Sequence, residues 1–75
     1  MPALPTLSGR EAVKAFNRKG WQLARQRGSH MIMVKPGHPS TLSIPDHKEL
    51  AKGTLRSLIR SGDLTVDEFI ELTNK

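Results

Sequence analysis

The chain has 75 residues, no cysteine, and twelve Lys and Arg against seven Asp and Glu, which gives a net charge of +5. A chain of this length forms one domain, residues 1–75, and buries only about 60% of the surface that it exposes when unfolded, so we expect a partner chain rather than disulfides to support it. No apolar run approaches the ~20 residues of a membrane span, and we expect a soluble, cytoplasmic protein with no membrane contact.

The basic side chains are unevenly distributed. Residues 1–45 contain seven of them against Glu11 alone, whereas residues 63–75 contain four acidic side chains against Lys75. A basic segment favours a polyanion such as nucleic acid as the partner, although a charge excess also serves solubility alone. Composition by itself leaves both interpretations open.

The first predicted element is a helix from Ser8 to about Lys19. Ser8 and Glu11 have the spacing of a capping box, and Gly20 stands where a helix commonly ends. One face carries a basic residue at every fourth position, namely Arg10, Lys14 and Arg18. Such spacing of like charges lowers helix stability unless solvent or an anion compensates for it, and solvation is the default.

Three strands are expected next, joined as an antiparallel meander. Residues 21–26 alternate large apolar with polar side chains, residues 30–35 are rich in Ile, Val and Met, and residues 41–44 precede a strand-ending proline. Gly28 and Ser29 supply the first turn, and a segment with Gly and Pro supplies the second.

Alternation along the second strand separates two faces. His30 falls on the face of Ile32 and Val34, while Met31 and Met33 make the opposite face apolar as well. The pattern therefore does not settle whether His30 is exposed.

Two helices are expected after the strands. An amphipathic pattern predicts one between Gly53 and Gly62, and a second capping box, Thr65 with Glu68, opens the last helix. The earlier of the two carries a second basic stripe, formed by Lys52, Arg56 and Arg60. The last has four candidates for burial: Val66, Phe69, Ile70 and Leu72. The whole order predicts an α+β domain with helices on one face of an antiparallel sheet, which is the layout of the double-stranded-RNA-binding domain.

Three segments stand in a characteristic order: GWQLARQRGSH at 20–30, IPDH at 44–47 and GTLRSLI at 53–59. Together they resemble the HicA (YcfA-like) family, and the likeness covers roughly residues 8–62. The resemblance implies a toxin of a type II toxin–antitoxin system, a ribonuclease that cuts messenger RNA and is held inactive by a HicB-type antitoxin protein. It also implies that the histidine of the Gly-Ser-His segment, here His30, is the functional residue.

One histidine is sufficient for this chemistry because RNA carries its own nucleophile, the 2′-hydroxyl beside each phosphate. An unperturbed imidazole, with a pKa near ~6.5, can accept that proton at cellular pH. We therefore expect His30 to be the general base, with no metal or other cofactor. Gly28 and Ser29 can bring backbone amides and a hydroxyl close to a phosphate, although an ordinary hairpin turn is the alternative.

The other two histidines receive different interpretations. His38 lies in a turn and is expected to be solvated. His47 either caps the following turn or acts as an auxiliary general acid, with the structural role favoured. The spacing of the three histidines fits no standard zinc pattern, so no metal site is expected.

Several basic side chains are candidates for contacts with RNA phosphates. Two lead into the turn, one leaves the adjacent strand, and two lie on the helix after the strands: Arg25 and Arg27, Lys35, and Lys52 and Arg56. For each one alone a solvated surface charge is at least as good an interpretation, and only the set indicates binding. Because aromatic residues are few and Trp21 is expected in the core, we expect cleavage with weak sequence selectivity.

Two other functions are compatible with the same sequence. The basic stripes and the fold would also serve a non-catalytic RNA- or DNA-binding module. Alternatively, the chain is an interaction module that binds a partner through a surface containing Met31 and Met33 or through its acidic last helix.

Overall fold

The computed structural model describes residues 3–74, which form three helices and one sheet. In chain order the elements are α1 (Gly9–Arg18), β1 (Gln22–Arg27), β2 (His30–Val34), β3 (Leu42–Pro45), α2 (Lys52–Ser61) and α3 (Val66–Thr73). The sheet has the order β1-β2-β3, and both pairs of neighbouring strands are antiparallel. Every predicted element is present, so the α+β fold with the layout of a double-stranded-RNA-binding domain is confirmed.

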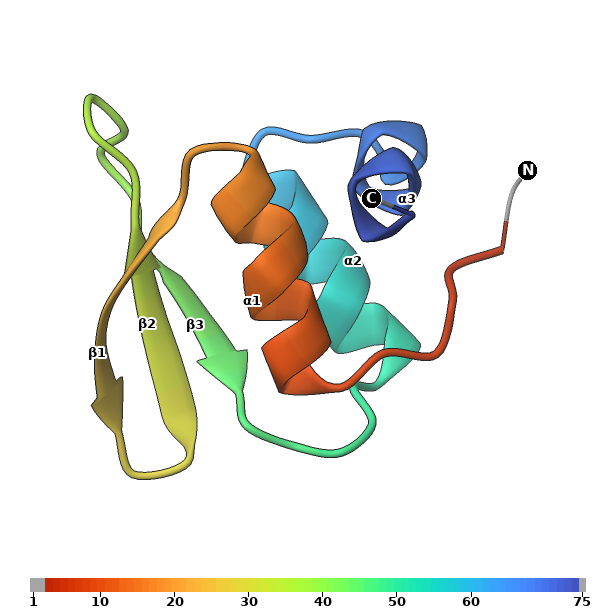
Figure 1. Cartoon of the computed structure of the whole chain (residues 1–75), viewed down its shortest axis with the longest axis horizontal. Helices are drawn as coiled ribbons and strands as arrows, with labels where there is room; N and C mark the ends of the chain where they lie inside the picture. Colours follow the sequence, from red (N-terminus) through yellow and green to blue (C-terminus); the bar gives the residue numbers. More distant parts are fainter. Residues whose placement is uncertain (1–2, 75) are drawn as a thin grey trace.

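The helices lie on one side of the sheet (Figure 1). Helix α1 contacts β1 and β3, α2 contacts β3, and α3 packs against the two other helices. The sheet therefore has one face covered by helices and one face that no described element covers. None of the helices in the described part of the chain is long and apolar enough to cross a membrane.

Two of the helices begin with the predicted capping boxes. At α1 the Ser8 hydroxyl accepts a hydrogen bond from the Glu11 N–H at 3.1 Å, and the Glu11 carboxylate accepts one from the Ser8 N–H at 3.0 Å. Thr65 and Glu68 make the same pair of bonds at α3. The pKa of Glu11 lies below the ordinary value of 4.5, mainly because of its hydrogen bond with the Ser8 backbone and to a lesser extent because of its hydrogen bond with the Ser8 side chain. Both sequence signals therefore mark true helix starts.

The core lies between the sheet and the helices. Its largest fully buried side chains are Trp21, Phe16, Phe69, Met33, Leu42, Ile44 and Leu55. The rings of Phe16 and Phe69 lie 5.1 Å apart, so α3 shares this core with α1. Trp21 is buried as predicted, whereas only Phe69 of the four candidates in α3 is fully buried and the other three are half-buried.

Met31 and Met33 belong to this core. Their exposed fractions are 4% and 0%, because they point from β2 toward the helices. The hypothesis that a partner binds through these two methionines is therefore wrong. Successive side chains of a strand point to opposite sides, so the other face of β2 is the one that the helices do not cover.

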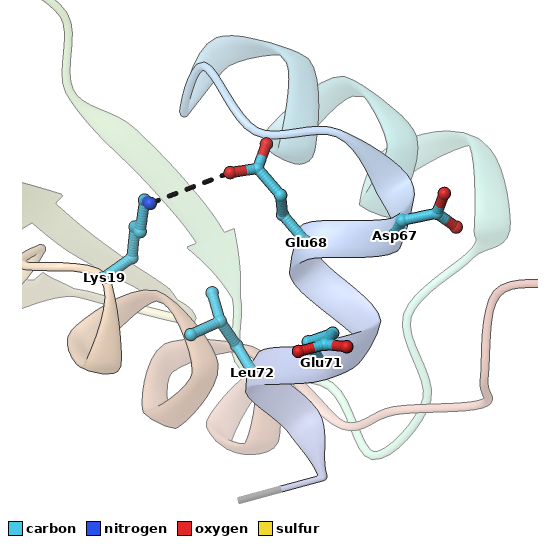
Figure 2. A pocket seen from close by; sticks show the side chains of 5 residues that line it. All are labelled: Lys19, Asp67, Glu68, Glu71 and Leu72. Carbon is cyan, nitrogen blue, oxygen red and sulfur yellow. Dashed lines mark ion pairs between the residues drawn. The ribbon is translucent and has the colours of Figure 1, made fainter.

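Opposite charges join the end of α1 to the acidic helix α3. The Lys19 ammonium lies 3.7 Å from a Glu68 carboxylate oxygen, across a hollow of about 380 Å³ that Leu72 also lines (Figure 2). The Arg18 guanidinium donates to the Leu72 carbonyl at 2.6 Å. Two of the basic side chains at this end of α1 are therefore engaged within the chain.

Gly9 provides a test of how closely α1 approaches the sheet. A Cβ on this residue would lie 2.0 Å from the Pro45 carbonyl oxygen, so Gly9→Ala forces the backbone to move. We expect the variant to lose at least about 1–3 kcal/mol of unfolding free energy, measured by urea denaturation. Gly53 is the matched control, because a Cβ there meets nothing within 4 Å, and Gly53→Ala should gain about 0.5–1 kcal/mol in helix α2. A Gly9→Ala variant as stable as the parent would contradict the close contact.

Candidate active site

On the uncovered side of the sheet, the two rows of side chains nearest the turn at residues 28–29 come from all three strands. Residues directly opposite one another in antiparallel strands point to the same face. The strand register gives these rows as Arg27, His30 and Pro45, and Arg25, Ile32 and Ser43. We refer to these six residues as the open face.

Four residues of the open face line a shallow hollow of about 330 Å³: Arg27, His30, Ile32 and Ser43. They come from all three strands, and His30 is exposed as the first residue of β2. The hollow combines a permanent cation, an imidazole, a half-buried aliphatic side chain and a hydroxyl. Such a combination can hold one phosphate together with the nucleoside beside it.

Hydrogen bonds to both residues of the turn before His30, Gly28 and Ser29, hold its backbone in place. Gly28 adopts a φ of 57°, a left-handed conformation that favours glycine. The Gln26 amide donates to the Gly28 carbonyl at 3.2 Å, and the Asp46 N–H donates to the Ser29 carbonyl at 2.7 Å. These bonds fix the backbone that presents His30.

Asp46 connects this turn to the rest of the fold. Its carboxylate accepts hydrogen bonds from the Arg10 guanidinium at 3.3 and 3.5 Å and from the Gln26 amide at 3.3 Å. One side chain after β3 thereby joins α1 to β1 next to the turn. Sequence reasoning assigned no role to Asp46 or Gln26, because their contact depends on residues that lie 20 positions apart.

Comparison with protein-family models gives a match over residues 9–64 to the HicA toxin of bacterial toxin–antitoxin systems. The chain belongs to the HicA toxin family. The match includes all six residues of the open face and ends before α3, which begins at Val66. No curated protein matches the chain.

The HicA motif residues and the basic residues predicted to bind RNA do not form a single surface. Arg25 and Arg27 lie with His30 on the open face. Lys35 lies beyond the far end of β2, about 16 Å from His30 at ~3.3 Å per residue, and its side chain reaches toward Gly20 on the helix side. The predicted set is therefore divided.

The two candidates on α2 lie on the helical layer. The Lys52 ammonium donates to the Leu4 carbonyl, and Arg56 lines a hollow with Arg60 beside the start of α3. Since the helices cover the opposite face of the sheet, these side chains do not share the hollow of His30. They belong to a basic surface separate from the open face. RNA contact by the basic residues of either surface stays a prediction.

His38 differs from its predicted solvated state. Its side chain is only 16% exposed, and its Nε2 lies 2.7 Å from a carboxylate oxygen of Asp63. Its Nδ1 accepts a hydrogen bond from the Ser40 N–H, and its ring lies 4.9 Å from the Trp21 ring. The ring therefore supports the core and the connection between α2 and α3.

His47 contributes to the structure through its backbone. Its carbonyl accepts a hydrogen bond from the Gly9 N–H at 2.8 Å, while its exposed side chain lines a separate hollow with Arg10 and Lys48. The hollow of His30 is lined without it, so the role of auxiliary acid stays a prediction. Within residues 3–74 no three His, Cys, Asp or Glu side chains are grouped so as to hold a metal ion.

The three histidines should differ in their effect on stability. We expect His38→Ala to lower the unfolding free energy by about 1–3 kcal/mol, because it removes two hydrogen bonds and a ring contact. His30→Ala and His47→Ala alter exposed side chains and should stay within about 0.5 kcal/mol of the parent. Urea denaturation of the three variants checks this, and a large loss in His30→Ala would show that His30 is structural.

Proposed function

We propose that this HicA-family chain is an endoribonuclease toxin that cuts messenger RNA in the cytoplasm, with His30 as the general base. The observation that supports the proposal is the position of His30, exposed in a hollow of the open face directly opposite Arg27. A general base needs access to the substrate, and a neighbouring cation is needed where the reaction builds negative charge.

The reaction requires few protein groups. A neutral ring nitrogen of His30 takes the proton of a ribose 2′-hydroxyl, and the 2′-oxygen then bonds to the adjacent phosphorus. The bond from phosphorus to the 5′-oxygen breaks, and that oxygen takes a proton from water or from an acid such as His47. The products end in a 2′,3′-cyclic phosphate and a 5′-hydroxyl.

The residues around His30 stabilise the negative charge that develops on the phosphate. The Arg27 guanidinium faces the phosphate position, and the Ser29 hydroxyl with the amides of Gly28 and Ser29 can donate to its oxygens. The nucleophile belongs to the RNA, so we propose that no metal or cofactor takes part. A positioned base contributes about 10²- to 10⁴-fold to such a reaction.

The same geometry supports inhibition by a HicB-type antitoxin that covers the open face. The open face has no helix over it, so a partner protein can cover the hollow directly. We propose that the antitoxin buries residues 28–30 in a hetero-oligomeric complex. Protection of these amides from hydrogen exchange in the complex would support this arrangement, and protection confined to other surfaces would contradict it.

Cleavage in the presence of chelator tests the central proposal. Purified protein should cut a single-stranded oligoribonucleotide in excess EDTA and leave 2′,3′-cyclic phosphate ends, which mass spectrometry identifies. His30→Ala should lower the rate by about 10²- to 10⁴-fold. The all-deoxy oligonucleotide should stay intact, because it lacks the nucleophile.

The controls separate the two parts of this proposal. If the protein binds RNA but leaves it intact, the chain is a non-catalytic binding module and not a ribonuclease. Equal cleavage by the parent and His30→Ala would leave a ribonuclease with a different base. His47→Ala tests the source of the leaving-group proton: a rate within about twofold of the parent assigns that proton to water, and a loss of about 10²-fold or more assigns it to His47.

The salt dependence of binding shows which basic surface holds RNA. In the His30→Ala background, where RNA is not cut, log Kd should rise with log salt, because phosphate contacts release counterions. We expect Arg27→Ala to weaken binding and reduce the slope by about 0.7, the contribution of one contact to a single strand. Lys35→Ala should change little, since it lies at the far end of the sheet on the helix side. If only Arg56→Ala weakened RNA binding, RNA would bind at α2, and the proposal that it binds at the open face would be contradicted.

A further inference from the structure

We propose that Ile32 and Ser43 form a nucleoside subsite beside His30, which holds the base of the nucleotide whose 2′-hydroxyl is deprotonated. This inference rests on the proposed function for the identity of the ligand as RNA. Neither residue stood out in the sequence, and both are identified by the strand register and by the hollow that they share with His30.

The position of the two residues follows from the sheet. Ile32 lies two residues after His30 on β2, and Ser43 is directly opposite Ile32 on β3. Successive residues on one face of a strand are about 6.6 Å apart, and diagonal neighbours across two strands are about 7–8 Å apart. Both side chains are therefore within the span of a nucleotide whose ribose lies at His30.

The hollow also gives the direction in which the nucleotide extends. From Arg27 and His30 it continues toward Ile32 and Ser43, whereas Pro45, the other neighbour of His30, does not line it. With the phosphate beside Arg27, the attached nucleoside has space on the side of Ile32. The opposite direction leads out of the hollow.

The chemistry of the two side chains suits a base of any type. Ile32 is half-buried and supplies an aliphatic surface against which the face of a base can pack. Ser43 is exposed, and its hydroxyl can both donate and accept a hydrogen bond at the edge of a base. Because a single hydroxyl satisfies either a donor or an acceptor, this subsite binds bases with little preference among them.

The experiment uses DNA oligonucleotides that contain one ribonucleotide, so that only one bond can be cut and the base beside His30 is known. Ser43→Val and Ser43→Thr have nearly the same shape and are both β-branched, and only threonine keeps the hydroxyl. Melting temperatures of both variants equal to that of the parent establish that neither disturbs the fold.

The expected result is a change in KM that follows the hydroxyl. Ser43→Val should raise KM by about 2- to 10-fold with kcat within about twofold of the parent, the effect of one neutral hydrogen bond made equally in the ground and transition states. Ser43→Thr should resemble the parent. On a substrate whose single ribose lacks a base, the two variants should have the same KM, because the contact is made to the base.

The possible failures are distinguishable. If the parent cuts RNA and both Ser43 variants have the same KM on every base, the subsite is wrong and the proposed ribonuclease stands. If the parent binds the strand without cutting it, the ribonuclease is wrong, and the ratio of Kd between Ser43→Val and Ser43→Thr still decides the subsite. A parent that neither cuts nor binds RNA overturns both proposals.

Discussion

The contact between the first turn of α1 and the segment after β3 determines where the open face lies. The Gly9 N–H donates to the His47 carbonyl, and Gly9 lies so close to the Pro45 carbonyl that no side chain fits. In the same segment the Asp46 N–H binds the Ser29 carbonyl, and its carboxylate binds Arg10. Helix α1, the end of β3 and the turn before His30 are thus joined within three residues. A change in the position of α1 against the sheet would therefore displace the turn that precedes His30, the proposed general base.

Local signals were sufficient to predict most of this fold. Capping boxes depend on side chains three residues apart, so Ser8 and Thr65 could be identified from the sequence as helix starts, and both are. Alternation along residues 30–34 placed His30 on the face opposite Met31, which is where the register puts it. The alternation left the exposure of that face open, because apolar residues occur on both sides. Only the position of the helices, a tertiary property, shows which side is covered.

The errors and omissions concern contacts between distant parts of the chain. His38 was assigned to solvent from its turn, but its partner Asp63 lies 25 positions away, in the connection between α2 and α3. Ser43 had a usable signal, since it alternates with the buried Leu42 and Ile44, yet only the pairing of β3 with β2 brings it opposite Ile32. Lys35 leaves the strand that begins at His30, and the length of that strand separates it from the turn, so its contact with RNA stays a prediction. In each case the sequence shows the face of an element but not the neighbour across it.

The distribution of charge narrows which surface is free to act on a polyanion. On α1, Arg10 is paired with Asp46, and Arg18 donates to the Leu72 carbonyl. Asp46 and the Leu72 carbonyl thus engage two members of the basic stripe that the sequence displayed, and the neighbouring Lys19 is paired with Glu68. Arg25 and Arg27 instead project from an exposed strand beside the hollow. Under the proposed function, RNA and an antitoxin would compete for these same side chains, so inhibition would require no change of shape in the toxin. A small chain whose helices all lie on one side of its sheet would thereby use its uncovered side for both catalysis and control.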